Sequence, residues 1–154
     1  MKTYNTTLLV LGSLILSSSA HASALNYVFN RGAISPENVS GWFCQITEDG
    51  VVKKPLGKSP YINVNAEDVR DPLIFSSQIP NQVVLDSLVE EASNHVVLSD
   101  GIGPIGGCNE TYTAITDNKI RLVLLRRSGG VVVSHNASSA AKKIEKFIDA
   151  NCGN

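Results

Sequence analysis

The sequence predicts an α+β fold, a small single domain in which about six to eight short strands form a mainly antiparallel sheet beside two helices. Short runs of β-branched and aromatic residues recur along the chain, separated by glycine, proline and asparagine, as is typical of short strands and turns. Two longer stretches, at about residues 81–93 and 138–150, space their apolar residues as amphipathic helices do. No internal repeat or long linker divides the 154 residues, so one core is expected.

The first 22 residues are typical of a cleaved secretory signal peptide. Lys2 precedes an apolar run at residues 8–16, and Ala20-His21-Ala22 has the small-x-small pattern at which signal peptides are cut. That run is much shorter than the roughly 20 residues that a membrane-spanning helix needs. We therefore expect residues 23–154 to be exported to the periplasm or the extracellular space as a single domain without a membrane span.

The first half of this domain is expected to consist of strands and loops, followed by the first helix. An Asp49-Gly50 turn joins two of the strands as a hairpin. Pro80-Asn81 opens the helix, whose apolar stripe consists of Val84, Leu85, Leu88, Val89 and Ala92. The expected strands are residues 25–30, 42–48, 51–54, 61–65 and 73–75.

Residues 119–150 are the stretch in which the local signals agree best, as a strand, a tight turn, a second strand and a helix. Before them, residues 95–98 fit a strand or the end of the first helix, and residues 111–116 fit a strand. The turn has a two-residue loop, either Ser128-Gly129 or Gly129-Gly130. These registers pair Leu124 with Val133 or with His135, and both place Val131, Val133 and His135 on the strand face of Leu122 and Leu124.

The helix after this hairpin has three candidate N-caps, Asn136, Ser138 and Ser139, whose side chains can accept from the free N–H groups of a first turn. Gly153 is predicted to end the helix. Its buried stripe is predicted to consist of Ala140, Ala141, Ile144, Phe147 and Ile148, with Cys152 on the same side.

All three cysteines, Cys44, Cys108 and Cys152, follow the predicted cut, and export favours one disulfide among three possible pairings. Cys44 shares a strand face with Trp42 and Ile46, so we expect it in the core as a free thiol. Cys108 and Cys152 both adjoin glycine at the ends of elements, where the chain is easier to bridge. The favoured disulfide is therefore Cys108–Cys152, which would close the hairpin and helix into one loop.

Gly101, Gly103 and Gly106 form a G-x-G-x-x-G pattern after a candidate strand. A dinucleotide site needs a helix to begin inside this motif, whereas Pro104 and a strand-like run follow here. We therefore expect no nucleotide cofactor, and no other cofactor is indicated. The loop is interpreted as a turn-rich connection, with contact to a ligand as the alternative.

Charge is distributed unevenly along the chain. Residues 66–118 hold nine acidic residues against Arg70, and residues 119–147 hold seven basic residues against Glu145. The favoured interpretation is that the two segments neutralise each other within the domain. The alternative is a basic surface that includes Arg121, Arg126 and Arg127 and meets an anionic partner, such as lipopolysaccharide or an acidic protein surface.

The remaining chemistry gives no motif for a metal or a catalytic group. His95 and His135 lie in no H-x-x-x-H, H-E-x-x-H or C-x-x-C frame, and no G-x-S-x-G is present. Adjacent Ser134 and His135 point to opposite faces of a strand, which is the wrong geometry for a nucleophile and its base. The candidate ligand-binding residues are Gly101, Gly103, Gly106, Arg121, Arg126, Arg127 and His135.

Export, small size, a disulfide and the lack of a catalytic motif predict a non-enzymatic binding or interaction protein, such as an inhibitor, an immunity factor or an accessory subunit. Its expected partner is a protein or an anionic surface. Two alternatives stay open. One is a small secreted hydrolase or toxin that uses His135 or His95. The other is an oligomeric toxin-type binding subunit that pairs exposed strand edges.

Overall fold

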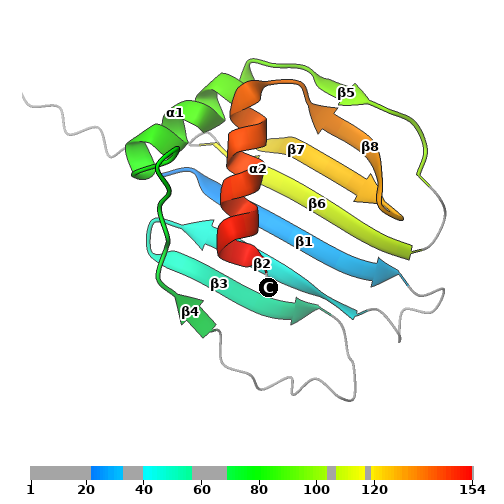
Figure 1. The fold of residues 1–154 in the computed structure, drawn as a ribbon, viewed down its shortest axis with the longest axis horizontal. Helices are drawn as coiled ribbons and strands as arrows, with labels where there is room; N and C mark the ends of the chain where they lie inside the picture. The colour runs from blue at the N-terminus through cyan, green and yellow to red at the C-terminus, as the bar shows by residue number, and fades with distance from the viewer. Residues whose placement is uncertain (1–21, 33–39, 57–68, 104–106, 117–118, 154) are drawn as a thin grey trace, which may run out of the picture.

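The computed structural model describes residues 22–32, 40–56, 69–103, 107–116 and 119–153, which form one eight-stranded antiparallel sheet with two helices on one of its faces (Figure 1). This confirms the predicted α+β class. The strand order across the sheet is β4-β3-β2-β1-β6-β7-β8-β5. In chain order the elements are β1 (Ala24–Gly32), β2 (Ser40–Thr47), β3 (Gly50–Leu56), β4 (Val69–Asp71), α1 (Gln82–Ser93), β5 (Val97–Ser99), β6 (Gly107–Ile115), β7 (Arg121–Ser128), β8 (Val131–Asn136) and α2 (Ser139–Cys152).

The sheet is built from two groups of strands that meet at its centre. Strands β1 to β4 lie side by side in chain order, and β6, β7 and β8 do the same, with β1 next to β6. The chain passes from the edge strand β4 through α1 to the opposite edge strand β5, while α2 runs back across the strands from β8 (Figure 1). The two helices therefore cover the same face of the sheet, called here the helix face.

The core lies between this face and the two helices. Leu25, Ile46, Ala114 and Leu124 point into it from β1, β2, β6 and β7, and each is at most 1 % exposed. Burying one such leucine or isoleucine side chain contributes about 1.5–3 kcal/mol. The predicted stripe of α2 is buried completely, and in α1 only Val84 of the predicted five is partly exposed. The helical periodicity therefore identified both buried helix faces.

Side-chain caps fix where the helices begin. The side chain of Asn81 accepts from Val84 N at 3.0 Å, and that of Ser138 accepts from Ala141 N at 3.0 Å. Asn136, another candidate cap, has a different role: it accepts from Ser138 N and donates to Ala92 O at 2.9 Å. It thus joins the end of α1 to the start of α2. Residues 95–98 divide between the end of α1 and β5, since His95 N still donates to Ala92 O.

Residues 73–75, predicted as a strand, are not in a strand; the short strand before them is β4, Val69–Asp71. Ile74 donates its N–H to Asn151 Oδ1 at 2.9 Å and accepts from Asn151 Nδ2 at 3.1 Å. One amide side chain therefore supplies both bonds that a neighbouring strand would make. The prediction was wrong because a run of three apolar residues does not by itself specify a neighbouring strand, and here an amide side chain takes its place. The strand predicted at residues 61–65 lies outside the described residues.

Two β-bulges change the predicted register of the β7–β8 hairpin. Its loop is Gly129-Gly130, both at positive φ, as one of the two predicted turns requires. Ser134 then pairs with Arg126 and Val132 with Arg127, which leaves Val133 without a partner on β7. His135 consequently pairs with Leu125, so neither predicted partner of Leu124 is found.

A second bulge leaves Leu124 unpaired with β6, where Tyr112 pairs with Leu125 and Thr113 with Val123. Each bulge shifts the alternation of side chains by one residue. As a result His135 and Leu122 share the helix face as predicted, whereas Val131 lies on the other face.

The disulfide joins Cys44 to Cys152, with a Cα–Cα distance of 5.8 Å, and the predicted Cys108–Cys152 disulfide is wrong. Cys44 faces the core as predicted. The buried end of α2 crosses the same face of the sheet above Cys44, so Cys152 at that end can reach Cys44. Cys108 lies at the start of β6, where its carbonyl accepts from Gly129 N beside the hairpin turn, and it is a half-buried free thiol.

Candidate functional site

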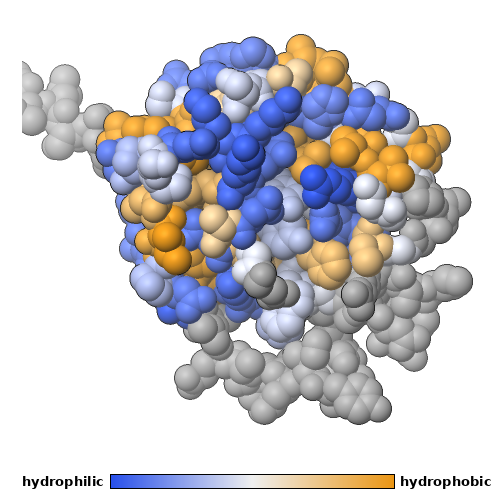
Figure 2. Space-filling view, in the orientation of Figure 1, coloured by the Kyte–Doolittle hydropathy of each residue, from blue (hydrophilic) through white to orange (hydrophobic). Residues whose placement is uncertain are grey.

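The two edges of the sheet carry different chemistry. Edge strand β5 pairs with β8 through Leu98 and His135, and no described strand lies beyond it. All three of its residues are exposed, with Leu98 at 45 %, and Val96 before it and Ile102 after it are more exposed still, at 71 % and 100 %. Figure 2 shows hydrophobic residues around both ends of β5 and over β8. This apolar edge, Val96–Ser99 with Ile102, is called here the β5 edge.

The opposite edge, β4, is protected in the usual way. Its residues Arg70 and Asp71 are exposed and charged. A short strand with charged side chains disfavours pairing with another chain, because docking would remove those charges from water. Strand β5 is equally short but holds no charged residue. Of the two edge strands of the described sheet, only β5 therefore holds no charged residue, and Asp100, which follows it, is paired with His135.

Beside the β5 edge lies a groove of about 370 Å³ between α2 and the helix face of β7 and β8, called here the α2 groove. It is apolar at its floor and charged along its sides. Its lining residues are Asp100, Leu125, Arg127, Val132, His135, Asn136, Lys142 and Glu145.

The side chains of His135 and Asp100 form a hydrogen-bonded pair at one side of this groove. His135 Nδ1 lies 2.5 Å from Asp100 Oδ2, and the two side chains are 31 % and 39 % exposed. The register of β8 turns the imidazole to the helix face, and the backbone bond from Asp100 N to Val133 O holds the aspartate beside it. The carboxylate fixes the ring orientation and leaves Nε2 for another group.

Arg127 is bound within the sheet. Its Nη1 donates to Glu110 Oε2 at 2.9 Å, from the neighbouring position on β6. This hydrogen bond raises the pKa of Arg127 above its ordinary value, despite partial burial. The pair joins the basic and acidic segments of the sequence, as the neutralising interpretation of the charge pattern expects.

Tyr112 links the same face to α2. Its hydroxyl donates to Asp149 Oδ1 at 2.8 Å, and its ring lies 4.8 Å from that of Tyr27. Burial raises the pKa of both tyrosines above the ordinary value, and the bond to Asp149 adds to this for Tyr112. Both therefore remain protonated at neutral pH, and Tyr112 acts as a fixed donor.

Glu145 is the acidic group of the groove without a hydrogen-bonding partner among the described residues. Burial raises the pKa of its carboxyl group, although the charges of Arg127, His135 and Lys142 lower it. A half-buried carboxylate of this kind can accept a cationic or donor group from a ligand.

The predicted ligand-binding residues do not form one site. Arg127 and His135 line the α2 groove. Arg126 pairs with Thr111 and Ser134 on the opposite face of the sheet and is exposed there. Arg121 lies at the distant end of β7, and Gly106 is outside the described residues.

The glycines of the loop have backbone roles. Gly101 has φ +125°, and a Cβ at Gly103 would lie 2.5 Å from Ser128 Cβ. Gly103 therefore permits close packing of the loop on the hairpin. Since β6 begins at Gly107, a strand follows where a dinucleotide motif needs a helix.

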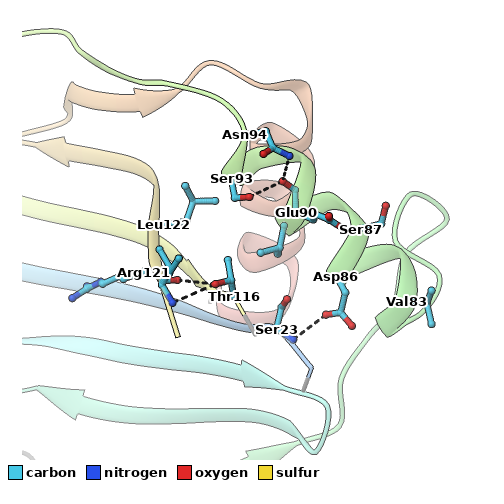
Figure 3. Close-up of a pocket in the computed structure, with 12 residues that line it drawn as sticks. Ser23, Val83, Asp86, Ser87, Glu90, Ser93, Asn94, Thr116, Arg121 and Leu122 are labelled. Atoms are coloured by element: carbon cyan, nitrogen blue, oxygen red, sulfur yellow. Dashed lines mark hydrogen bonds between the residues drawn. The ribbon is translucent and has the colours of Figure 1, made fainter. Parts of the chain in front are cut away.

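A second cleft, of about 770 Å³, separates α1 from the end of β6 and the start of β7 (Figure 3). Acidic side chains of α1 line one wall, and Figure 3 shows the side chain of Arg121 directed away from that helix. The cleft, called here the α1 cleft, is lined by Ser23, Val83, Asp86, Ser87, Val89, Glu90, Ser93, Asn94, Thr116, Ile120, Arg121 and Leu122.

Sequence reasoning missed Asp100, Lys142 and Glu145 as members of the groove. Their positions give little signal, because Asp100 meets His135 only after β5 has paired with β8, and Lys142 and Glu145 do so only after α2 has packed on the sheet. The three-residue spacing of Lys142 and Glu145 does place both on one side of α2 and was the one usable signal.

Within the described part of the chain, no cluster of three or more His, Cys, Asp or Glu side chains is arranged to hold a metal ion. None of the helices in the described ranges is long and apolar enough to cross a membrane. No protein-family model, curated protein or solved structure shows significant similarity to this chain.

Proposed function

We propose that this protein is an exported, non-enzymatic binding protein that docks an extended segment of a partner protein along the β5 edge. The observation that carries the proposal is the exposed and uncharged strand β5 with its apolar neighbours Val96 and Ile102, in contrast to the charged strand β4. The signal-like residues 1–22 support export, and so does the Cys44–Cys152 disulfide, which is typical of oxidising compartments.

Docking of this kind adds a ninth strand to the sheet. The partner's backbone would pair with the outer N–H and C=O groups of β5, and apolar side chains of the partner would cover Val96, Leu98 and Ile102. Leu98 lies on the helix face because it pairs with His135, so alternate partner side chains would extend toward the α2 groove. In that groove, the carboxylate of Glu145 favours a lysine or arginine side chain of the partner.

Site-specific photo-crosslinking tests this proposal. A photoreactive residue replaces Val97 in one variant and Arg70, on the opposite edge, in a matched control. Both variants are irradiated in the native cell, in the compartment to which the protein is exported. We expect a defined hetero-complex from position 97 and none from position 70. Leu98→Asp should abolish the crosslink while leaving the thermal midpoint of unfolding within a few degrees of wild type, because the side chain is exposed.

Two outcomes contradict the proposal. A crosslinked product that contains two copies of this chain would instead support the oligomeric subunit that pairs its strand edges. Equal crosslinking from both positions would show that the β5 edge is not a specific surface.

A secreted hydrolase is the second candidate, and the His135–Asp100 pair beside Glu145 is the observation that favours it. The aspartate would orient the imidazole as a general base, and Glu145, whose carboxyl pKa is raised by burial, would serve as a general acid. Hydrolysis of a panel of ester, amide, phosphodiester and glycoside substrates distinguishes the two candidates. Activity that is lost in His135→Gln but retained in Leu98→Asp would support the hydrolase.

A further inference from the structure

We infer that cleavage after Ala22 makes Ser23 the amino terminus and that Asp86 then binds the new ammonium group, which fastens the start of β1 to α1. The inference rests on the proposed export. It goes beyond the predicted cut by assigning the group that receives the processed end.

The geometry at Ser23 already contains the receiving carboxylate. Ser23 N donates to Asp86 Oδ1 at 2.9 Å, across 63 positions of sequence, and Ser23 is 4 % exposed. Gln82 Nε2 donates to the same carboxylate oxygen at 2.8 Å and lies 3.4 Å from Ser23 O. Figure 3 shows Ser23 and Asp86 facing each other at the α1 cleft.

Two independent features therefore identify the same peptide bond. The small-x-small pattern ends at Ala22, and the nitrogen of the next residue is the one that meets Asp86. Backbone N–H groups at the start of an inner strand usually pair with another strand, so a side-chain carboxylate on a separate helix is a distinct arrangement.

Hydrolysis changes the chemistry of this contact. Water adds across the Ala22–Ser23 amide: its hydroxyl completes the carboxyl group of Ala22, and a proton completes the amine of Ser23. At neutral pH the amine gains a further proton and becomes an ammonium group with three donors. A single neutral N–H donor to Asp86 is thereby replaced by a charged donor, and charge-assisted hydrogen bonds are about twice as strong as neutral ones.

The charges nearest Ser23 favour the ammonium form. Asp86 of α1 accepts from Ser23 N, and Arg121 of β7 directs its guanidinium group away from the cleft. The chain that retains residues 1–22 makes only the neutral contact, so removal of the leader is expected to strengthen the fold after export.

A double-mutant cycle tests the inference. The chain starting at Ser23 is compared with the same chain acetylated at Ser23, each with Asp86 and with Asp86→Asn, by urea unfolding at pH 6.5. With Asp86 present, we expect acetylation to lower the folding equilibrium constant about tenfold, the size of a charge-assisted hydrogen bond. In Asp86→Asn the loss should be less than about twofold, and in the control Glu90→Gln it should stay about tenfold.

The pH dependence gives a second readout. An amino terminus held by a carboxylate has a higher pKa in the folded than in the unfolded chain, where it is about 8. Its stabilisation is therefore complete below about pH 8 and is lost as the pH rises through the folded value. An equal effect of acetylation with and without Asp86, or an effect independent of pH, would overturn the inference.

Amino-terminal sequencing of the exported protein separates this inference from the proposed function. An exported chain that begins at a residue other than Ser23 refutes the inference and leaves export intact. Retention of the whole chain inside the cell refutes both.

Discussion

At the scale of single residues, two buried asparagines connect segments that lie far apart in the sequence. Asn136 joins the end of α1 to the start of α2. Asn151 bonds both backbone groups of Ile74 and also donates to Phe147 O. Asn136 and Asn151 are buried, so each of their bonds replaces a bond to water that the folded chain cannot make.

Asn151→Ala is expected to lower the free energy of unfolding by about 2–4 kcal/mol, because it leaves the N–H and C=O groups of Ile74 without partners in a partly buried place. Urea unfolding measures the loss, and Lys146→Ala, exposed on the same helix, should change stability by less than about 0.5 kcal/mol. Equal losses in the two variants would mean that Asn151 has no specific structural role.

Glu145 makes stability depend on pH in a direction that can be predicted. Burial raises the pKa of its carboxyl group in the folded chain, so the folded chain binds the proton more tightly than the unfolded chain does. Stability from this group is present below the unfolded pKa of about 4.3 and is lost as the pH rises through the folded value.

Glu145→Gln should therefore gain stability relative to wild type as the pH rises from about 4 to 7, and thermal unfolding across that range measures the difference. Lys146→Gln, which removes an exposed charge from the same helix, provides the reference for a general charge effect. A difference that is constant with pH would rule out a buried carboxylate at position 145.

At the scale of elements, the β7–β8 hairpin depends on backbone shapes that side chains do not supply. Its loop has both glycines at positive φ, and its two bulges decide which side chains reach the helix face. One residue of slip would turn His135 to the other face, away from Asp100 and the α2 groove.

Gly130→Ala tests the turn. The residue has φ +81° and no atom within 4 Å of an added Cβ, so the whole effect is backbone strain. We expect a loss of about 1–2 kcal/mol in the free energy of unfolding, and a smaller loss for Gly130→Asn, since asparagine tolerates this conformation better. Identical losses for alanine and asparagine would show that the turn changes its shape in the variants.

At the scale of the whole molecule, α1 and α2 bind the two halves of the sheet together. The chain between β4 and β5 joins opposite edges, and α2 ends above β2 at the Cys44–Cys152 disulfide, which spans 108 positions of sequence. Closing so long a loop restricts the unfolded chain strongly and the folded chain very little.

The double variant Cys44→Ala/Cys152→Ala should therefore lose about 4 kcal/mol of stability, and Cys108→Ala much less, because Cys108 is a half-buried free thiol. Non-reducing peptide mapping should recover a Cys44–Cys152 peptide pair, with Cys108 open to alkylation after unfolding. Recovery of a Cys108-containing pair, or a larger loss in Cys108→Ala, would contradict the structure.

The sequence by itself determined the features that local chemistry controls. The apolar spacing of both helices and the start of α1 at Asn81 depend on residues within a few positions of one another. For the same reason the sequence reduced the cap of α2 to three candidates and the hairpin turn to two, and the structure has Ser138 and Gly129-Gly130. The α+β class follows because short strands separated by turns, beside two amphipathic helices, bury their apolar sides in a two-layer arrangement.

Only the tertiary structure decided which distant groups meet. Cys44 rather than Cys108 joins Cys152, Asn151 rather than a strand pairs with Ile74, and Asp100 and Glu145 reach His135. Each of these depends on where α2 crosses the sheet and on two bulges in the ladder, and neither is encoded in a local pattern. The position of β5 at an edge could not be predicted for the same reason. Which strand lies at the edge depends on the order of all eight strands, which local propensity does not specify.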